Sequence, residues 1–171
     1  VPTSRTSVKY ICRRIDGLRP VVVVEYGPGT GVFTKHLLRH LHPDSLVLAI
    51  ELNRKFARRL RAASQRRRLR KPRLVVENDT ACNIRTLLEK YGRTSADYVL
   101  SGIPFSFFPD PLKREIIQTT HDALKPGGTF VAYQFRSGLA RYMREFFPEV
   151  RVSRSEEHTS ELQSQFRISY A

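Results

Sequence analysis

One stretch near the amino terminus, VVVVEYGPGTG at positions 21–31, constrains the fold more than any other part of the sequence. Four valines with no polar alternation are typical of a parallel strand that is covered on both faces. Gly27, Gly29 and Gly31 follow at alternate positions, and glycine lets a ligand lie directly against the main chain. The amphipathic run 32–41 predicts a helix whose N-terminal amides point at that ligand. The stretch therefore predicts a nucleotide-binding corner of strand, loop and helix.

The spacing of these glycines argues against a dinucleotide. They follow the pattern G-x-G-x-G, whereas the dinucleotide fingerprint is G-x-G-x-x-G. Glu25 also lies two residues before the first glycine, where its carboxylate would repel a pyrophosphate. We therefore expect a ligand that carries a positive group near the loop.

Two later acidic residues extend the expected ligand site. Residues 45–51 (SLVLAIE) predict a second buried strand that ends in Glu51, 20 residues beyond Gly31. A βαβ nucleotide fold places at that distance the carboxylate that accepts hydrogen bonds from the ribose hydroxyls. Residues 73–77 predict a third strand, and Asp79 just past it could accept a hydrogen bond from an adenine amino group or cap the next helix.

The fourth predicted strand, residues 97–101, runs into a loop of unusual composition. Residues 102–109 (GIPFSFFP) contain three phenylalanines and two prolines, which is not typical of a simple connector. We expect this loop to line the mouth of the substrate site. A hydrophobic plug over the end of the sheet is the alternative.

The order of these segments predicts the fold class. Five alternations of strand and helix indicate an α/β protein of Rossmann-like type with a doubly wound, mostly parallel sheet. Such sheets bind ligands at the carboxyl ends of their strands. Because Glu25, Glu51, Asp79 and Ser101 all lie at predicted strand ends, we expect them to meet at one edge of the sheet.

The net charge of +14 indicates an anionic partner, either RNA or an acidic membrane surface. The arginine-rich residues 58–73 are the strongest candidate for contacting phosphates, with a solvated helix face as the alternative. Residues 1–20 predict an amphipathic basic helix whose apolar stripe either packs on the sheet or lies on anionic lipid. This stripe consists of Val8, Ile11, Cys12 and Ile15.

The remaining composition narrows the expected location. Cys12 and Cys82 stand in no metal-ligand spacing, so we expect no metal site. No apolar run reaches the roughly 18 residues that a spanning helix needs. We expect a monomeric cytoplasmic protein, either freely diffusing or peripheral on the inner face of the membrane.

The carboxyl-terminal residues depart from this pattern. Residues 154–164 are acidic in a basic chain, lack any apolar period, and resemble the translation of a sequencing-library adapter. We therefore expect residues 154–171 to be foreign or out of register, the natural chain to end near Ser153, and the sheet to lack its last strands. The source nucleotide sequence over these codons would test that expectation.

Together the motifs resemble those of class I S-adenosylmethionine-dependent methyltransferases. The resemblance rests on the glycine corner, on the two later acids and on the turn at 125–128 (KPGG) before a strand, and it covers roughly residues 3–153. It implies an S-adenosylmethionine-binding methyltransferase domain over residues 21–153. The glycines would pass under the methionine part of the cofactor, with Glu25 near them, Glu51 on the ribose and Asp79 on the adenine.

The resemblance also assigns the remaining site residues. The cofactor-binding residues would be Glu25, Gly27, Pro28, Gly29, Thr30, Gly31, Glu51, Leu52, Asp79, Thr80 and Ser101. The catalytic residues, which shape the methyl-acceptor pocket, would be Ser101, Gly102, Ile103, Pro104 and Phe105.

Two families within this class are similar in VVEYGPGTGVFTKHLL and AIELNRKFARRL. They are the bacterial phospholipid N-methyltransferases that act on phosphatidylethanolamine and the ribosomal RNA adenine dimethyltransferases. The RNA enzymes carry an Asn-Leu-Pro-Tyr type motif after the fourth strand. Here residues 102–105 read GIPF after Ser101, so the amide that grips the adenine is missing.

We therefore expect N-methylation of a phospholipid headgroup amine of the phosphatidylethanolamine type, at an anionic membrane surface. The first alternative is an rRNA adenine N6-methyltransferase, which the arginine run and Phe105 as a stacking platform would favour. The second alternative is an inactive cofactor-binding fragment.

Overall fold

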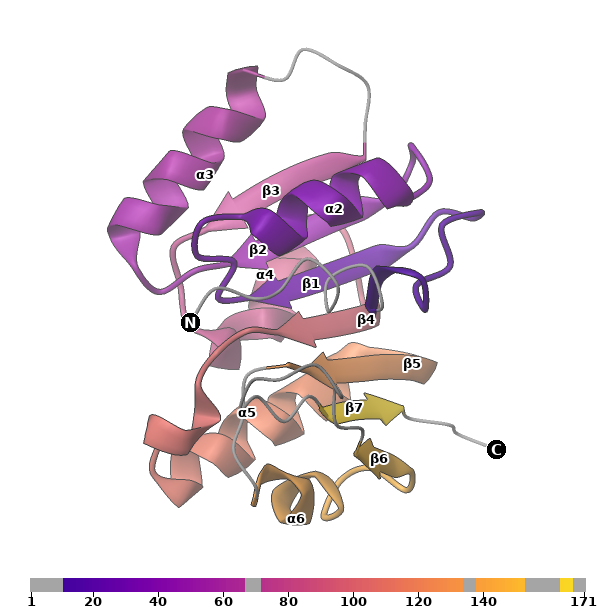
Figure 1. Ribbon diagram of the computed structural model, residues 1–171, viewed down its shortest axis with the longest axis vertical. Helices are drawn as coiled ribbons and strands as arrows, with labels where there is room; N and C mark the ends of the chain where they lie inside the picture. The colour runs from indigo at the N-terminus through magenta and orange to yellow at the C-terminus, as the bar shows by residue number, and fades with distance from the viewer. Residues whose placement is uncertain (1–10, 67–71, 134–137, 153–163, 168–171) are drawn as a thin grey trace, which may run out of the picture.

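The computed structural model describes residues 11–66, 72–133, 138–152 and 164–167 (Figure 1). The strands are β1 (Val22–Tyr26), β2 (Leu46–Ile50), β3 (Arg73–Glu77), β4 (Ala96–Ser101), β5 (Leu124–Ala132), β6 (Val150–Val152) and β7 (Ser164–Arg167). The helices are α2 (Val32–His40), α3 (Arg54–Arg66), α4 (Ile84–Lys90), α5 (Asp110–Ala123) and α6 (Leu139–Met143), with 3-10 turns η1 (Ala81–Asn83) and η2 (Phe105–Phe107).

The strands form one seven-stranded sheet in the order β3-β2-β1-β4-β5-β7-β6. Strands β1 to β5 are parallel, and β7 runs antiparallel to both β5 and β6. The direction of strand order reverses at β1, which lies between β2 and β4. Tyr26 at the end of β1 is level with Ile50 of β2 and Ser101 of β4. The predicted α/β, doubly wound class is confirmed, and the carboxyl ends of these three strands share one edge.

The expectation that the last strands would be missing is wrong, because β6 and β7 both join the sheet. Residues 129–132 of β5 pair with residues 164–167 of β7. The sequence QFRISY at 165–170 alternates polar and apolar residues, a period-two pattern typical of a strand. The polar segment 154–164 before it concealed this pattern. Residues 153–163 lie outside the described part of the chain, and the foreign origin of 154–171 stays a hypothesis.

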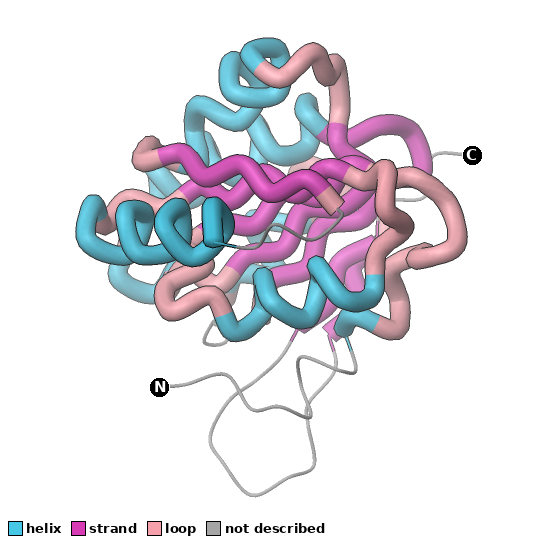
Figure 2. Tube along the Cα trace, turned by 90° about the horizontal axis from the view of Figure 1, so that it is seen from above, coloured by secondary structure: helices cyan, strands magenta, loops and turns pink. Residues whose placement is uncertain are grey.

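Helices cover both faces of the sheet (Figures 1 and 2). Successive side chains of a strand point to opposite faces, and the core divides accordingly. Val23 and Leu100 pack in the cluster under α2, whereas Val24, Tyr26 and Phe130 pack in the cluster with α4, α5 and α6. A side chain at the end of a strand therefore points either to the face covered by α2 or to the face covered by α4, α5 and α6, depending on its position in the strand.

The described part of the amino-terminal segment packs against the sheet. Ile11, Cys12 and Ile15 are 1–5% exposed and belong to the cluster under α2. Helical geometry there is limited to Ile11 and Cys12, and residues 13–20 form turns and loop. Val8 lies outside the described residues. These three side chains are therefore core residues, and the alternative in which they lie on lipid does not hold.

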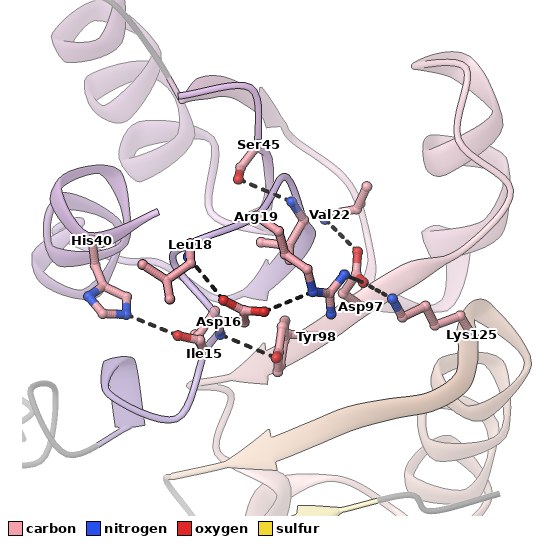
Figure 3. Close-up of polar contacts among 11 residues, drawn as sticks. Ile15, Asp16, Leu18, Arg19, Val22, His40, Ser45, Asp97, Tyr98 and Lys125 are labelled. Carbon is pink, nitrogen blue, oxygen red and sulfur yellow. Dashed lines mark hydrogen bonds and ion pairs between the residues drawn. The ribbon is translucent and has the colours of Figure 1, made fainter. Parts of the chain in front are cut away.

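A group of charged residues closes the opposite, amino-terminal edge of the sheet (Figure 3). The Asp97 Oδ2 atom accepts a hydrogen bond from the Val22 amide at 2.8 Å. The other carboxylate oxygen of Asp97 forms ion pairs with Arg19 and Lys125. Asp16 pairs with Arg19 in turn, at 2.8 Å. These contacts tie the segment before β1 to the starts of β4 and β5.

Candidate active site

The glycine loop after β1 has one open position and two packed ones. Gly27, Gly29 and Gly31 have φ angles of +64°, +53° and +75°, which disfavour any residue with a side chain. A Cβ atom on Gly27 would lie 2.8 Å from Ile103 Cγ2, and one on Gly31 would lie 2.7 Å from Leu60 Cδ1. A Cβ atom on Gly29 would meet nothing within 4 Å. The first and third glycines therefore permit close packing, and the middle one faces open space where a ligand can lie.

Glu51, at the end of β2, is held beside this loop. Its Oε2 atom accepts a hydrogen bond from the Gly29 amide at 2.9 Å, and its Oε1 atom accepts one from the Asn53 amide at 2.8 Å. The Asn78 side chain donates to the backbone carbonyls of Glu51 and Leu52 at 2.8 and 3.0 Å. Each carboxylate oxygen keeps a further lone pair that can accept a hydroxyl. The arrangement suits a ribose with two adjacent hydroxyls.

Glu25 is fully buried on the α2 side of the sheet. Its Oε2 atom accepts a hydrogen bond from the Thr34 hydroxyl at 2.6 Å, and its Oε1 atom has no hydrogen-bond partner within the described residues. Burial raises the pKa of this carboxyl to about 7, the Thr34 hydrogen bond opposes that rise, and the negative charge of Glu51 adds to it. A buried carboxylate with an unpaired oxygen is costly until a positive group approaches it.

Asp79 and Thr80 follow β3 at the same edge. The Asp79 Oδ1 atom accepts hydrogen bonds from the Thr80 amide at 2.7 Å and from the Asn83 side chain at 2.8 Å. The Thr80 hydroxyl accepts one from the Cys82 amide at 3.3 Å and so caps η1. Asp79 thus makes local contacts through Oδ1, and within the described residues no hydrogen bond engages its Oδ2 atom, which can accept one from a ligand. Leu52 exposes 76% of its surface at the end of the neighbouring strand.

The loop after β4 buries the ring of Phe105 at the end of the sheet and exposes the ring of Phe107 to solvent. Phe105 is 1% exposed, and its ring lies edge-on to Phe108 with centroids 5.9 Å apart. Phe107 is 84% exposed. Phe105 therefore cannot serve as a stacking platform for a base, which corrects that part of the RNA alternative. The pattern of three phenylalanines did not reveal which ring would be buried.

Ser101 and Gly102 open this loop. The Ser101 side chain is fully buried, and its hydroxyl has no hydrogen-bond partner within the described residues. A Cβ atom on Gly102 would lie 2.6 Å from the hydroxyl oxygen of Tyr133. The Tyr133 hydroxyl therefore occupies the space that any side chain at position 102 would need. Ile103 is half-buried and packs over Gly27, and Pro104 is exposed.

Three residues of this site were missed in the sequence: Thr34, Asn78 and Tyr133. Tyr133 follows β5, stacks on Phe33 with centroids 4.9 Å apart, and is 4% exposed. Burial and the nearby Glu25 carboxylate hold the pKa of its phenol well above the usual value. Their positions in the sequence could have indicated them. Asn78 and Tyr133 directly follow strands, and Thr34 lies in the first turn of the helix after the glycine loop.

The predicted basic surface is described only in part. Arg54, Lys55, Arg58 and Arg59 are exposed on α3, and Arg61 donates to the Val76 carbonyl at 2.6 Å. Residues 67–71 of the arginine-rich run lie outside the described residues. Within the described ranges, no helix is long and apolar enough to cross a membrane. The same ranges contain no group of three His, Cys, Asp or Glu side chains that could hold a metal ion.

These groups fit the parts of S-adenosylmethionine one by one. The open space at Gly29 and the unpaired Glu25 oxygen suit a chain that carries a positive charge, and the spare lone pairs of Glu51 suit its ribose. The exposed Leu52 and the second oxygen of Asp79 offer an apolar face and an acceptor to an adenine. Residues 101–105 follow β4 at the same edge of the sheet, where Ile103 packs over Gly27.

Comparison with known proteins agrees with this geometry. The family model described as "Methyltransferase domain" matches residues 23–128. A protein named Ornithine lipid N-methyltransferase from Singulisphaera acidiphila is 37% identical over 148 residues, which cover 86% of this chain and 73% of that protein.

Solved structures show the same fold at low identity. The N-methyltransferase NodS from Bradyrhizobium japonicum superposes with a TM-score of 0.74 at 15% identity, covering 97% of this chain and 96% of that one. A putative rRNA methylase from Clostridium thermocellum superposes with a TM-score of 0.66 at 16% identity over the whole of both chains. With the family match over more than half of the sequence, the chain belongs to the class I S-adenosylmethionine-dependent methyltransferases, and S-adenosylmethionine is its cofactor.

Proposed function

We propose that this enzyme transfers a methyl group to the amine of a membrane lipid headgroup, of the phosphatidylethanolamine type. The observation that carries the proposal is the 37% identity, over 86% of the chain, with a protein named as a lipid N-methyltransferase. That relative's name specifies ornithine lipid, which makes an ornithine headgroup the second candidate. Both acceptors present an amine beside the polar surface of a bilayer.

The bound cofactor supplies a methyl group on a positively charged sulfur. The lone pair of the neutral acceptor amine forms the new C–N bond while the C–S bond breaks, and the bonding electrons go to sulfur. An ammonium headgroup must first lose a proton to the solvent or to a base. Alignment of amine, methyl and sulfur in a dry site supplies most of the acceleration in such a reaction.

We assign the chain's own contributions by position. Glu25 and residues 27–31 hold the charged chain of the cofactor, and Glu51 holds its ribose. Asp79, with Leu52 and Thr80, holds the adenine. Residues 101–105 exclude water from the acceptor side and set the approach of the amine.

Two contacts favour a lipid amine over an RNA adenine. The Tyr133 hydroxyl fills the space at Gly102, where the RNA enzymes place the amide that grips the adenine. Phe105, at the aromatic position of that motif, is buried and unable to stack on a base. The structural likeness to an rRNA methylase, at 16% identity, extends to the fold alone.

Methyl-labelled S-adenosylmethionine tests the acceptor directly. The protein is incubated separately with vesicles that contain phosphatidylethanolamine, with vesicles that contain ornithine lipid, and with structured ribosomal RNA. We expect label in a lipid fraction after chromatography, and much less of it with the Glu51→Ala variant at a low cofactor concentration. Label in RNA alone would overturn the proposal. Cofactor binding by calorimetry without label in any pool would favour the inactive fragment.

The same proposal places the protein as a monomer on the inner face of the membrane. Light scattering in the absence of lipid, and flotation with vesicles, measure these two properties. A stable dimer in dilute solution would contradict the first of them.

A further inference from the structure

We propose that the carboxyl edge of the sheet lies against an anionic lipid bilayer, with Phe107 inserted among the acyl chains and the cations at the start of α3 on the headgroups. This inference rests on the proposed lipid acceptor and names the surface that brings the lipid to the site. We refer to this surface, which comprises Phe107, Arg54, Lys55 and Arg58, as the docking edge.

Phe107 is exposed at the end of a hydrogen-bonded 3-10 turn. It ends η2, in which the Phe107 amide donates to the Pro104 carbonyl and the Phe108 amide donates to the Phe105 carbonyl, both at 3.1 Å. Phe105 fixes the turn from below because it is buried in the core. The Phe107 ring remains 84% exposed, which is unfavourable in water for an apolar side chain of this size.

The start of α3 carries exposed positive charge. Arg54, Lys55 and Arg58 are exposed, and no ion pair engages them within the described residues. The first turn of α3 has no acidic residue, although the amino end of a helix is itself positive. Cations at this end destabilise the helix until an anion approaches. An anionic headgroup supplies that complementary charge.

The two features flank the site. The glycine loop follows β1, whereas α3 follows β2 and η2 follows β4, and these strands are the two neighbours of β1. In Figure 1 the first turn of α3 and the turn before α5 both lie on the left side of the molecule. A flat bilayer that touches both would therefore face the glycine loop between them, and a headgroup amine would enter without leaving the membrane surface.

The exposed Phe107 ring together with the cations at the start of α3 favours a lipid bilayer as the partner. One apolar anchor gives only weak membrane binding, and a basic patch beside it supplies the second signal that a stable association requires. A nucleic acid would use the same ring for stacking, so RNA is an explicit outcome of the test below.

The opposite edge of the sheet provides a matched control. Leu18 is 93% exposed and lies among the contacts at the amino-terminal edge (Figure 3), where the docking edge does not reach. Phe107→Ser and Leu18→Ser each remove one exposed apolar side chain. Neither change opens a cavity in the core, so both variants are expected to fold, which thermal melting checks.

Vesicle sedimentation measures the effect. We expect wild type to bind vesicles of phosphatidylcholine with phosphatidylglycerol more tightly than vesicles of phosphatidylcholine alone. Phe107→Ser should weaken the binding roughly ten- to hundred-fold, from the transfer of one phenylalanine, and Leu18→Ser should leave it unchanged. Replacing Arg54, Lys55 and Arg58 by Gln should weaken it about fivefold per charge and flatten its salt dependence.

An activity readout separates this inference from the proposed function. On lipid dispersed in detergent, Phe107→Ser should lose much less activity than on vesicles. If wild type methylates lipid but Phe107→Ser and Leu18→Ser bind vesicles equally, the docking edge is wrong and the lipid acceptor stands. If wild type methylates no lipid in either form, the proposed function itself fails. Binding of wild type to structured RNA but not to vesicles at matched salt would also overturn the docking edge.

Discussion

The Glu51 carboxylate accepts a hydrogen bond from the Gly29 amide at 2.9 Å, which ties the end of β2 to the open glycine of the loop after β1. The group proposed to bind the ribose thereby also positions the loop proposed to lie under the methionine part of the cofactor. Because this hydrogen bond orders the glycine loop before the cofactor binds, the loop loses less conformational entropy on binding than a mobile loop would.

Replacement of Glu51 by Ala should weaken S-adenosylmethionine binding roughly 5- to 150-fold, because a charged hydrogen-bond partner is worth about 1–3 kcal/mol. Isothermal titration calorimetry measures the dissociation constant. Glu89→Ala, an exposed acid on α4, is the matched control and should bind as wild type does. Equal affinities of the two variants would remove Glu51 from the site.

Burial of Glu25 should make the stability of the free protein depend on pH. Its pKa is raised from 4.5 to about 7 in the folded state, so the unfolded chain ionises first as the pH rises. Stability is therefore lost between about pH 4.5 and pH 7, by about 3 kcal/mol in total, and changes no further above that range. Urea titrations of wild type and Glu25→Gln should show the difference between them growing across this window. Parallel pH profiles would contradict the assignment.

Cofactor binding should show the opposite dependence on pH. Protonated Glu25 offers no charge to the positive cofactor, whereas its carboxylate does, so affinity should rise as the pH passes through about 7. Binding below that pH should release a proton, which calorimetry in buffers of different ionisation enthalpy detects. In Glu25→Gln this component should vanish. A proton release that survives the substitution would assign it to another group.

The close approach of Tyr133 to Gly102 predicts a specific steric conflict. The Cβ atom of Gly102→Ala would lie 2.6 Å from the Tyr133 hydroxyl oxygen, so the variant should lose about 1–3 kcal/mol of stability and most of its activity. Tyr133→Phe removes that oxygen, and the double variant should recover part of the stability. Additive effects in this double-mutant cycle would show that the two residues do not interact.

Asp97 should matter for stability and not for the cofactor, because its contacts lie at the opposite edge of the sheet. Asp97→Ala leaves the Val22 amide without its 2.8 Å acceptor and separates Lys125 from its partner. We expect a loss of about 1–3 kcal/mol in unfolding free energy with unchanged affinity for S-adenosylmethionine. Arg19→Gln removes only a half-exposed partner and should cost less than about 1 kcal/mol. A fall in cofactor affinity in Asp97→Ala would contradict this separation of the two edges.

The placement of the candidate site residues at one edge of the sheet was predictable from the sequence, because it follows from the parallel arrangement of the strands. The carboxyl ends of such strands meet at one edge, so Glu25, Glu51 and Asp79 could be brought together from strand ends alone. The contacts that depend on tertiary packing could not be predicted from the sequence. Which of Phe105 and Phe107 faces inward depends on the 3-10 turn of η2, and the position of the Tyr133 hydroxyl depends on the pairing of β5 with β4.

The last strands show a different limit. The antiparallel strand β7 lies between β5 and β6, and the short alternating segment QFRISY at 165–170, which follows a long polar stretch, is its signal in the sequence. The expectation of missing strands was wrong because the polar, adapter-like residues 154–164 indicated a foreign tail, so the alternation that follows them was not assigned to the sheet.

The place of β7 also determines when the molecule can be completed during synthesis. β7 lies between β5 and β6, and β6 pairs with no other strand in the described sheet. Until residues 164–167 emerge from the ribosome, β5 presents an unpaired edge and β6 has no place to dock. The nascent chain can assemble its nucleotide-binding half early, but β5 keeps an open, aggregation-prone edge until residues 164–167 are translated.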